Sequence, residues 1–294
     1  MGPIGVWTSA LDHVPASEAR ERAAELEALG FGTLWLPEVA GRDPFAHAAL
    51  LLASTSTLVV ATGIANIWAR DAIAMNSGHR TLTEAFPERF VLGLGVSHQP
   101  LVAGLRGHDY RNPLQAMRAY LDAMDSAPFT ARRPSTPPRR MLGALRGKML
   151  RLAAERTDGA HPYFVPPEHT AWARGELGEE PLLCPEQAVV LETDPARARD
   201  LARTHLAFYF DLPNYMNNLR QFGIGEDDIA DGGSDRLVDA IVAWGDEEAV
   251  ARRIKEHIDA GANHVCVQVI ADDRRTVPVD AWRRLAPVLC ESAA

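Results

Sequence analysis

The fold is indicated most clearly by residues 58–98, which read LVVATGIANIWARDAIAMNSGHRTLTEAFPERFVLGLGVSH. Residues 58–65 are rich in apolar and β-branched side chains, as expected for a strand that is buried on both faces. Asp71 is a typical helix-capping residue, and the helix that it begins is expected to run to about Glu84. A second apolar run follows at residues 90–96. The stretch therefore predicts a strand, a helix and a strand in succession.

The same alternation extends in both directions along the chain. Further strands are predicted at residues 4–8, 33–36, 141–145, 159–163, 188–192 and 264–270. Further helices are predicted at residues 17–29, 44–53, 112–124, 148–155 and 167–175, from 194 onward, and at 246–261 and 278–289. Ser17 is expected to cap the first helix and Gly30 to end it. Residues 211–241 are interrupted by Asn, Asp and Gly, and predict a helical insertion after the seventh strand.

Eight buried strands alternating with helices favour an α/β fold of the (β/α)8 TIM-barrel type, built as one domain over residues 1–294. A doubly wound open sheet is the alternative. In a barrel the chemistry is located at the carboxyl ends of the strands. Among the residues expected there are Glu38, Asn66, Ser97, His98 and His161.

Composition excludes several classes of function. The formal charge of −9 is unsuited to a general nucleic-acid footprint, and no apolar stretch is long enough to predict a membrane span. The ten histidines include no H-x-H or H-E-x-x-H spacing, and the three cysteines are far apart, so neither a metal site nor a disulfide framework is predicted. We expect a cytoplasmic protein whose partner is a small molecule.

Three blocks carry a resemblance to a known family. They are VATGIANIWARD at residues 60–71, RFVLGLGVSH at 89–98 and DAGANHVCVQ at 259–268. Together they resemble the luciferase-like monooxygenase superfamily, and in particular its branch of coenzyme F420-dependent oxidoreductases. The resemblance covers almost the whole chain and implies a luciferase-like (β/α)8 barrel.

The resemblance also implies where a cofactor would be held. In F420-binding relatives the third strand carries a bulge with a non-prolyl cis peptide, which falls here at Gly63-Ile64, although Gly63 also suits close packing inside the barrel. The other residues implied for the ring and its surroundings are Asn66, Trp68, Gly95, Val96 and Ser97. The phosphate is expected at Ala144, Leu145, Arg146, Gly147 and Lys148, where Arg146-Gly147 replaces the usual Gly-Pro.

Glu38, His98 and His161 are the candidates for acid–base chemistry, because carboxylates and imidazoles at strand ends can exchange protons with a bound ligand. Glu38 is also compatible with a solvated ion pair to Arg42, and each histidine with a purely structural role.

The resulting expectation is an F420-dependent oxidoreductase that transfers a hydride between the deazaflavin C5 and a small organic substrate. Two alternatives stay open. One is an FMN-dependent monooxygenase that uses reduced flavin from a partner reductase, and the other is a flavin- or deazaflavin-binding protein without turnover. A homodimer is compatible with the resemblance.

Overall fold

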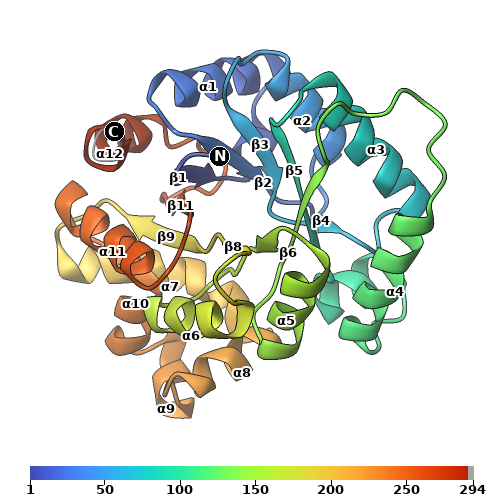
Figure 1. The fold of residues 1–294 in the computed structure, drawn as a ribbon. Helices are drawn as coiled ribbons and strands as arrows, with labels where there is room; N and C mark the ends of the chain where they lie inside the picture. Colours follow the sequence, from blue (N-terminus) through green and yellow to red (C-terminus); the bar gives the residue numbers. More distant parts are fainter. Residues whose placement is uncertain (291–294) are drawn as a thin grey trace.

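The computed structural model describes residues 1–290. One sheet contains all the strand segments of that part of the chain, and every hydrogen-bonded pair in it is parallel (Figure 1). The segments are β1 (Ile4–Trp7), β2 (Thr33–Leu36), β3 (Val59–Thr62), β4 (Ala65–Asn66), β5 (Phe90–Gly95), β6 (Arg139–Leu142), β7 (Gly159–Ala160), β8 (Leu182–Leu183), β9 (Glu186–Val190), β10 (Val242–Trp244) and β11 (Val265–Val269).

The sheet closes into a barrel through the segment that contains β8 and β9. β8 pairs with β7, and β9, which follows after two residues, pairs with β11. The amide of Cys266 donates to the carbonyl of Pro185 at 3.0 Å, which continues the β11 ladder between the two segments. With β3–β4 and β8–β9 each counted as one interrupted strand, residues 1–290 contribute eight barrel strands, and β10 lies beside β9. The predicted (β/α)8 barrel is confirmed.

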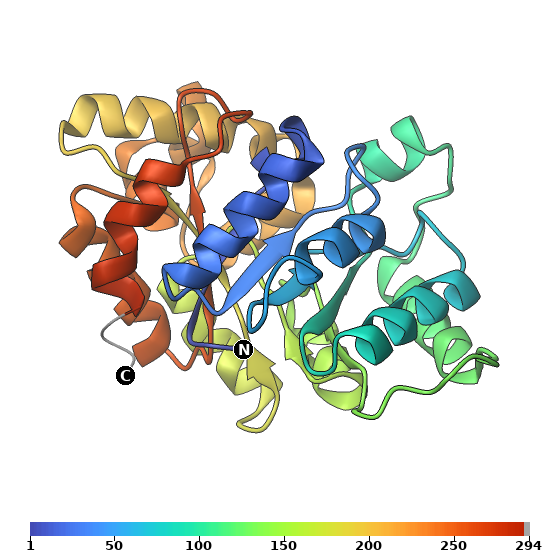
Figure 2. The same cartoon turned by 90° about the horizontal axis from the view of Figure 1, so that it is seen from above.

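Helices surround the barrel (Figures 1 and 2). The α-helices are α1 (Ala16–Ala28), α2 (Pro44–Leu52), α3 (Ala72–Ala85), α4 (Pro113–Ser126), α5 (Gly147–Arg156), α6 (Pro167–Leu177), α7 (Pro195–Phe210), α8 (Pro213–Gln221), α9 (Glu226–Ile229), α10 (Asp235–Ile241), α11 (Glu247–Asp259) and α12 (Val279–Cys290). Short 3-10 segments occupy η1 (Ala10–His13) and η3 (Ala230–Gly232), and η2 (Pro100–Leu105) is π-helical.

Side-chain caps explain several of the helix starts. The side chains of Asp71, Asp194 and Asp246 each accept a hydrogen bond from the backbone amide three residues later, at 2.8 to 2.9 Å. The predicted cap at Ser17 is wrong. α1 begins one residue earlier, after Pro15, whose φ of −54° already suits a helix, and no side chain caps it. Gly30 adopts a φ of +90° just after this helix, as expected for a residue that ends one.

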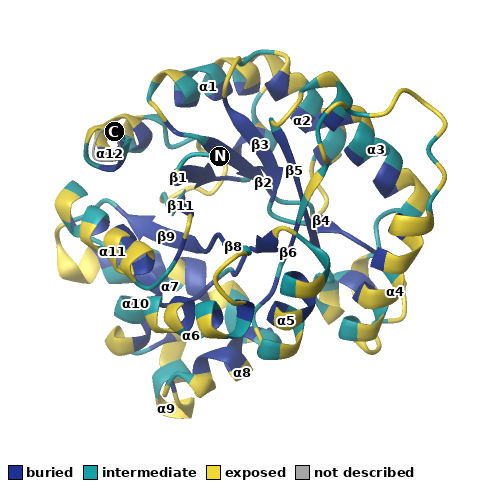
Figure 3. Ribbon diagram, viewed as in Figure 1, coloured by how far each residue is buried: buried dark blue, intermediate teal, exposed yellow. Residues whose placement is uncertain are grey.

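The interior of the barrel is filled below its carboxyl end. One buried cluster gathers side chains from strands all around the barrel: Trp7, Trp35, Val59, Ala61, Val91, Met141, Cys184 and Cys266. Figure 3 shows the strands buried and the outer faces of the helices exposed. The side chains of this cluster therefore fill the barrel below the carboxyl ends of its strands.

Residues 211–241 contain the helices α8, α9 and α10. With α7 they enclose a second hydrophobic cluster that includes Leu206, Met216 and Leu237. The strands β8 and β10 were not predicted, because segments of two and three residues carry no periodic signal. Within residues 1–290 no helix has both the length and the apolar character needed to cross a bilayer.

Candidate cofactor and substrate site

A cavity of about 760 Å³ opens at the carboxyl ends of the strands. Its walls come from the segments after β2, β3, β5, β6 and β7, and from α5, α7 and α8. Thirteen of the fifteen predicted site residues line it: Glu38, Gly63, Ile64, Gly95, Val96, Ser97, His98, Ala144, Leu145, Arg146, Gly147, Lys148 and His161. The barrel thus gathers residues from five separate stretches of sequence into one space.

The wall between β3 and β4 is formed by Gly63 and Ile64, whose peptide bond is cis. The Trp7 indole donates a hydrogen bond to the Gly63 carbonyl at 2.9 Å. A Cβ at residue 63 would lie 2.8 Å from Trp7 Nε1 and 3.1 Å from His161 Nε2. A Cβ at Gly95 would overlap the Ile64 side chain. Glycine at 63 and 95 is therefore required by the neighbouring protein side chains, whatever ligand the cavity holds.

His161 forms the floor of the cavity beside Gly63. Its ring stacks on Trp35, with centroids 4.3 Å apart, and its Nδ1 lies 2.7 Å from the Cys184 carbonyl. Since a carbonyl only accepts, Nδ1 carries the proton and Nε2 presents a lone pair that has no partner among residues 1–290. Burial lowers the pKa of His161 to about 4, below the ordinary value of 6.5. At neutral pH this atom accepts hydrogen bonds and has no proton to give.

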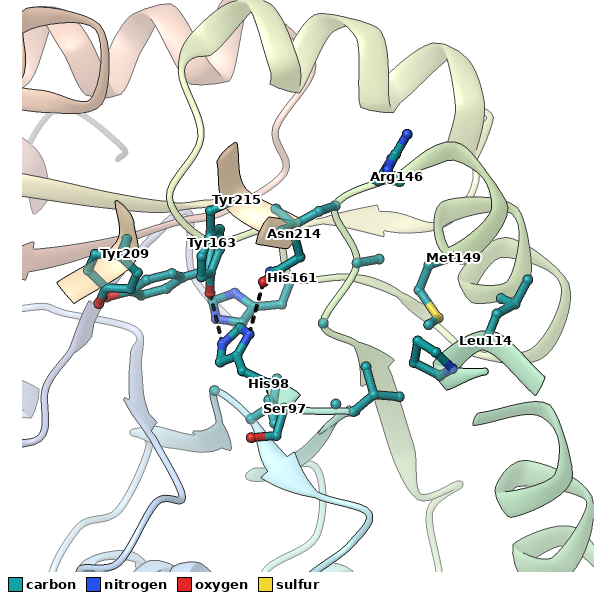
Figure 4. Close-up of a pocket in the computed structure, with 18 of the residues that line it drawn as sticks. Ser97, His98, Leu114, Arg146, Met149, His161, Tyr163, Tyr209, Asn214 and Tyr215 are labelled. Atoms are coloured by element: carbon teal, nitrogen blue, oxygen red, sulfur yellow. Dashed lines mark hydrogen bonds between the residues drawn. The ribbon is translucent and has the colours of Figure 1, made fainter. Parts of the chain in front are cut away.

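His98 connects the loop after β5 to α8 (Figure 4). Its Nδ1 lies 3.2 Å from the Asn214 side-chain oxygen, and its Nε2 lies 3.5 Å from the Tyr215 hydroxyl. Burial lowers the pKa of His98. With the Asn214 oxygen accepting from Nδ1, the Tyr215 hydroxyl is the donor to Nε2. The imidazole is thus held in one tautomer by two side chains of α8.

Glu38 lines the cavity, but its carboxylate is occupied by protein groups. It forms an ion pair with Arg70 and accepts from the Asn66 amide at 2.7 Å. The side chain is only 8% exposed. The pairing with Arg42 that the sequence left open does not occur, because Arg42 donates instead to the carbonyls of Leu11 and Val14.

Asn66 and Trp68 do not line the cavity. The Asn66 side-chain oxygen accepts from the Trp68 amide at 3.0 Å, and the Trp68 indole donates to the Val96 carbonyl at 3.0 Å. These contacts attach the segment after β4 to the end of β5. The two residues therefore stabilise the cavity wall through hydrogen bonds to its backbone, and they do not line the space a ligand would occupy.

One end of the cavity is cationic. Arg146, Lys148 and Arg151 line it around the start of α5, a helix of ten residues whose N-cap residue, Arg146, makes no side-chain cap. The amides of Gly147 and Lys148 donate to no group within residues 1–290. Of these three cations, Arg151 forms an ion pair with Glu176. Arg146 and Lys148 have no carboxylate partner within residues 1–290. Free amides and positive charge at a helix start favour an anion.

The other end of the cavity is aromatic, which was not predicted. Figure 4 shows Tyr163, Tyr209 and Tyr215 on one side of His98, with Arg146 on the other. The hydroxyls of Tyr163 and Tyr209 lie 2.6 Å apart, and the Tyr163 hydroxyl donates to the Gln268 side-chain oxygen at 2.7 Å. Tyr163 is the last residue of a predicted strand, so its position was a usable signal. Tyr209 and Tyr215 belong to helices, and no sequence signal placed these residues at the site.

Glu186 is a buried carboxyl near this aromatic end. One of its oxygens accepts from the Phe164 amide at 3.2 Å, and the other has no hydrogen-bond partner within residues 1–290. Burial raises the pKa of Glu186 to about 8. At neutral pH the group is mainly an uncharged acid.

Comparison with known proteins places this geometry in a family. Residues 3–264 match the family described as luciferase-like monooxygenase. A Mycobacterium tuberculosis protein, provisionally named a coenzyme F420-dependent oxidoreductase, is 27% identical over 248 residues, which cover 70% of this chain and 70% of that protein.

Two solved structures share the fold. An F420-dependent secondary alcohol dehydrogenase in complex with an F420-acetone adduct superposes with a TM-score of 0.77 at 15% identity, covering 98% of this chain and 99% of that one. The oxygenating constituent of 3,6-diketocamphane monooxygenase from Pseudomonas putida, in complex with FMN, superposes with a TM-score of 0.72 at 16% identity, covering 100% of this chain and 98% of that one. Since the family match spans most of the sequence and the barrel agrees with it, the chain belongs to the luciferase-like monooxygenase family.

Proposed function

We propose that this protein is an F420-dependent oxidoreductase that transfers a hydride between C5 of the deazaflavin and a small organic substrate. The observation that carries the proposal is the form of one cavity, in which a wall bounded by glycines adjoins a helix start with unpaired amides and cations. A planar ring attached to a phosphate-bearing chain requires both features. The related protein named as F420-dependent supports the choice of deazaflavin.

Each part of the cavity has a proposed role in binding. Gly63, Ile64, Gly95, Val96 and Ser97 would form the surface against which the ring lies. The bound deazaflavin supplies the hydride chemistry, and the chain supplies position and electrostatics.

At the other end, the phosphate would be held by the α5 amides with Arg146 and Lys148. Arg146 stands where relatives place glycine, yet it lines the cavity beside the free amides of Gly147 and Lys148. Its charge therefore supports an anion at this end.

The acid–base groups have narrower roles than their residue types suggest. His161 Nε2 would accept a hydrogen bond from an N–H or O–H of the ligand, because its lone pair faces no donor of residues 1–290. Glu38 would position the loop at Asn66 and hold Arg70, since both carboxylate oxygens already accept. His98 would hold α8 over the cavity through Asn214 and Tyr215.

Residues 211–241 are proposed to form an insertion within a single barrel domain and to cover the substrate. Asn214 and Tyr215, from the start of α8, line the cavity and contact His98. The aromatic end formed by Tyr163, Tyr209 and Tyr215 would then adjoin the substrate, because the opposite end is suited to the phosphate.

The cofactor assignment is tested by fluorescence titration of the apo-protein with F420 and, separately, with FMN. We expect F420 to bind at micromolar concentration. Arg146→Met should weaken that binding about tenfold, because a charge-assisted contact to phosphate is lost. Arg118→Met is the matched control, since Arg118 is an exposed arginine on α4, paired with Glu155 and outside the cavity.

Two results would contradict the proposal. Micromolar binding of FMN without binding of F420 would support the monooxygenase alternative. The FMN-bound structure of the same fold is the reason to test it. Binding of F420 with no substrate-dependent oxidation of its reduced form, across a panel of carbonyl compounds, would support a binding protein without turnover.

A further inference from the structure

We propose that a second, smaller cavity at the aromatic end is a substrate subsite that takes the carboxylate end of an apolar acid. The cavity has a volume of about 220 Å³ and shares Trp7, Pro37, Val39, Phe208 and Tyr209 with the main cavity. The two spaces are thus neighbours across one set of side chains, at the end away from the cationic start of α5. That the acid is a substrate rests on the proposed function; that the subsite binds a carboxylate does not.

The boundary between the two cavities is apolar and partly open to solvent. Val39 is 47% exposed and Phe208 is 50% exposed, and both line both spaces. Trp7 and Tyr209 complete this boundary. Large exposed apolar side chains at the rim of a cavity are stabilised when an apolar ligand covers them. The ligand that spans the boundary should therefore have a hydrocarbon or aryl body.

The far side of the smaller cavity is rich in hydrogen-bond donors. Arg274 donates from one nitrogen to the carbonyls of Thr204 and His205, and its remaining nitrogens bond to no group of residues 1–290. The Gln268 side-chain oxygen accepts from Tyr163, which leaves the Gln268 amide nitrogen as an unpaired donor in the described chain. Arg274 lines this cavity and forms no ion pair with a carboxylate of residues 1–290, and the nearby Asp272 pairs with Arg197.

His205 adds a buried polar atom to the same wall. It is 4% exposed, lines the smaller cavity, and its Nε2 has no hydrogen-bond partner within residues 1–290. The only acidic side chain among the residues that line this cavity is Asp273, and one of its oxygens accepts from the Arg275 amide.

A carboxylate matches the unpaired donors of Arg274 and Gln268 better than a neutral group or a doubly charged group does. It brings one negative charge to one unpaired guanidinium, and its two oxygens accept from Arg274 and from the Gln268 amide. The volume also suits a small terminal group. An apolar body on Val39 and Phe208 with a carboxylate at Arg274 thus defines an amphiphilic acid.

The test measures binding of hexanoate and of 1-hexanol by ligand-observed NMR titration of the intact protein. We expect hexanoate to bind more tightly than 1-hexanol, and Arg274→Met to weaken hexanoate binding about tenfold without changing the affinity for 1-hexanol. Arg275→Met is the matched control, because Arg275 is the exposed neighbouring arginine and lies outside both cavities. It should leave both affinities unchanged.

A third variant locates the carboxylate. If Arg146→Met, and not Arg274→Met, weakens hexanoate binding, the anion sits at the start of α5 and the subsite is refuted. Equal affinity of the native protein for hexanoate and 1-hexanol would also refute it. Titration with F420 is a separate readout: failure of F420 to bind would overturn the cofactor assignment and leave the hexanoate result standing. Arg274→Met should keep its affinity for F420.

Discussion

At the level of single residues, burial sets the protonation of the groups around the cavity. His161 is a histidine whose pKa lies at about 4, and Glu186 is a carboxyl whose pKa lies at about 8. In both cases removal from water disfavours the charged form, so both side chains are mainly neutral at pH 7. The cavity floor therefore interacts with a ligand through hydrogen bonds, and within the main cavity the cations without a carboxylate partner in residues 1–290 are Arg146 and Lys148.

Glu186→Gln should remove the contribution of this one carboxyl group to the pH dependence of the free energy of unfolding. The folded-state pKa of about 8 is above the ordinary value of 4.5, so the contribution of Glu186 is complete below about pH 4.5 and is lost as pH rises towards 8. Glutamine stays neutral throughout. Between pH 5.5 and 8.5 the free energy of unfolding of the variant should therefore gain about 3 kcal/mol relative to the native protein.

Urea unfolding of both proteins at the two pH values measures this difference. Glu21→Gln serves as the control, because Glu21 is exposed and makes no hydrogen bond or ion pair with residues 1–290. A gap between native protein and Glu186→Gln that stays constant with pH would show that Glu186 is ionised in the fold.

At the level of elements, the helix α8 forms part of the cavity wall above the barrel strands. It packs mainly on α7, and its polar contact with a strand end is made by Asn214 and Tyr215 to His98. The polar link between the cover of the cavity and the barrel therefore consists of two hydrogen bonds, one of 3.2 Å and a longer one of 3.5 Å, beside the apolar packing of α8.

Asn214→Ala should loosen α8 while leaving the barrel intact. The lost bond to His98 is worth about 1 kcal/mol, so amide hydrogen exchange in residues 213–221 should become about fivefold faster. Exchange in β1 and β5 should not change. Asn217→Ala is the control on the same helix, since Asn217 is exposed and bonds only to Arg220 within the described chain. Equal acceleration in both variants would assign the effect to helix propensity and not to the contact with His98.

At the level of the whole molecule, the barrel buries many histidines in neutral form. Burial lowers the pKa to about 3 or 4 at six of them: His79, His161, His169, His205, His257 and His264. The unfolded chain would take up protons at these positions as pH falls below 6.5, whereas the folded protein would not.

Acid should therefore unfold the protein steeply. The stabilisation is complete above pH 6.5 and decreases as pH falls towards 4, at up to about 1.4 kcal/mol per pH unit for each histidine. The urea midpoint should be much lower at pH 5 than at pH 7.5. His13→Gln should leave this profile unchanged, because His13 is exposed. A midpoint that is the same at pH 5 and pH 7.5 would contradict the burial of neutral imidazoles.

The order of strands and helices was determined by the sequence alone, because apolar periodicity, aspartate caps and helix-ending glycines act over a few neighbouring residues. The position of the interrupted third strand at Gly63-Ile64 was also identified, through a local sequence block. The partners of the functional side chains were decided only by the tertiary structure. His98 meets Asn214 across 116 residues, and Tyr163 meets Gln268 across 105. No local pattern encodes such pairs, since they form only when barrel closure brings distant strand ends and helices together.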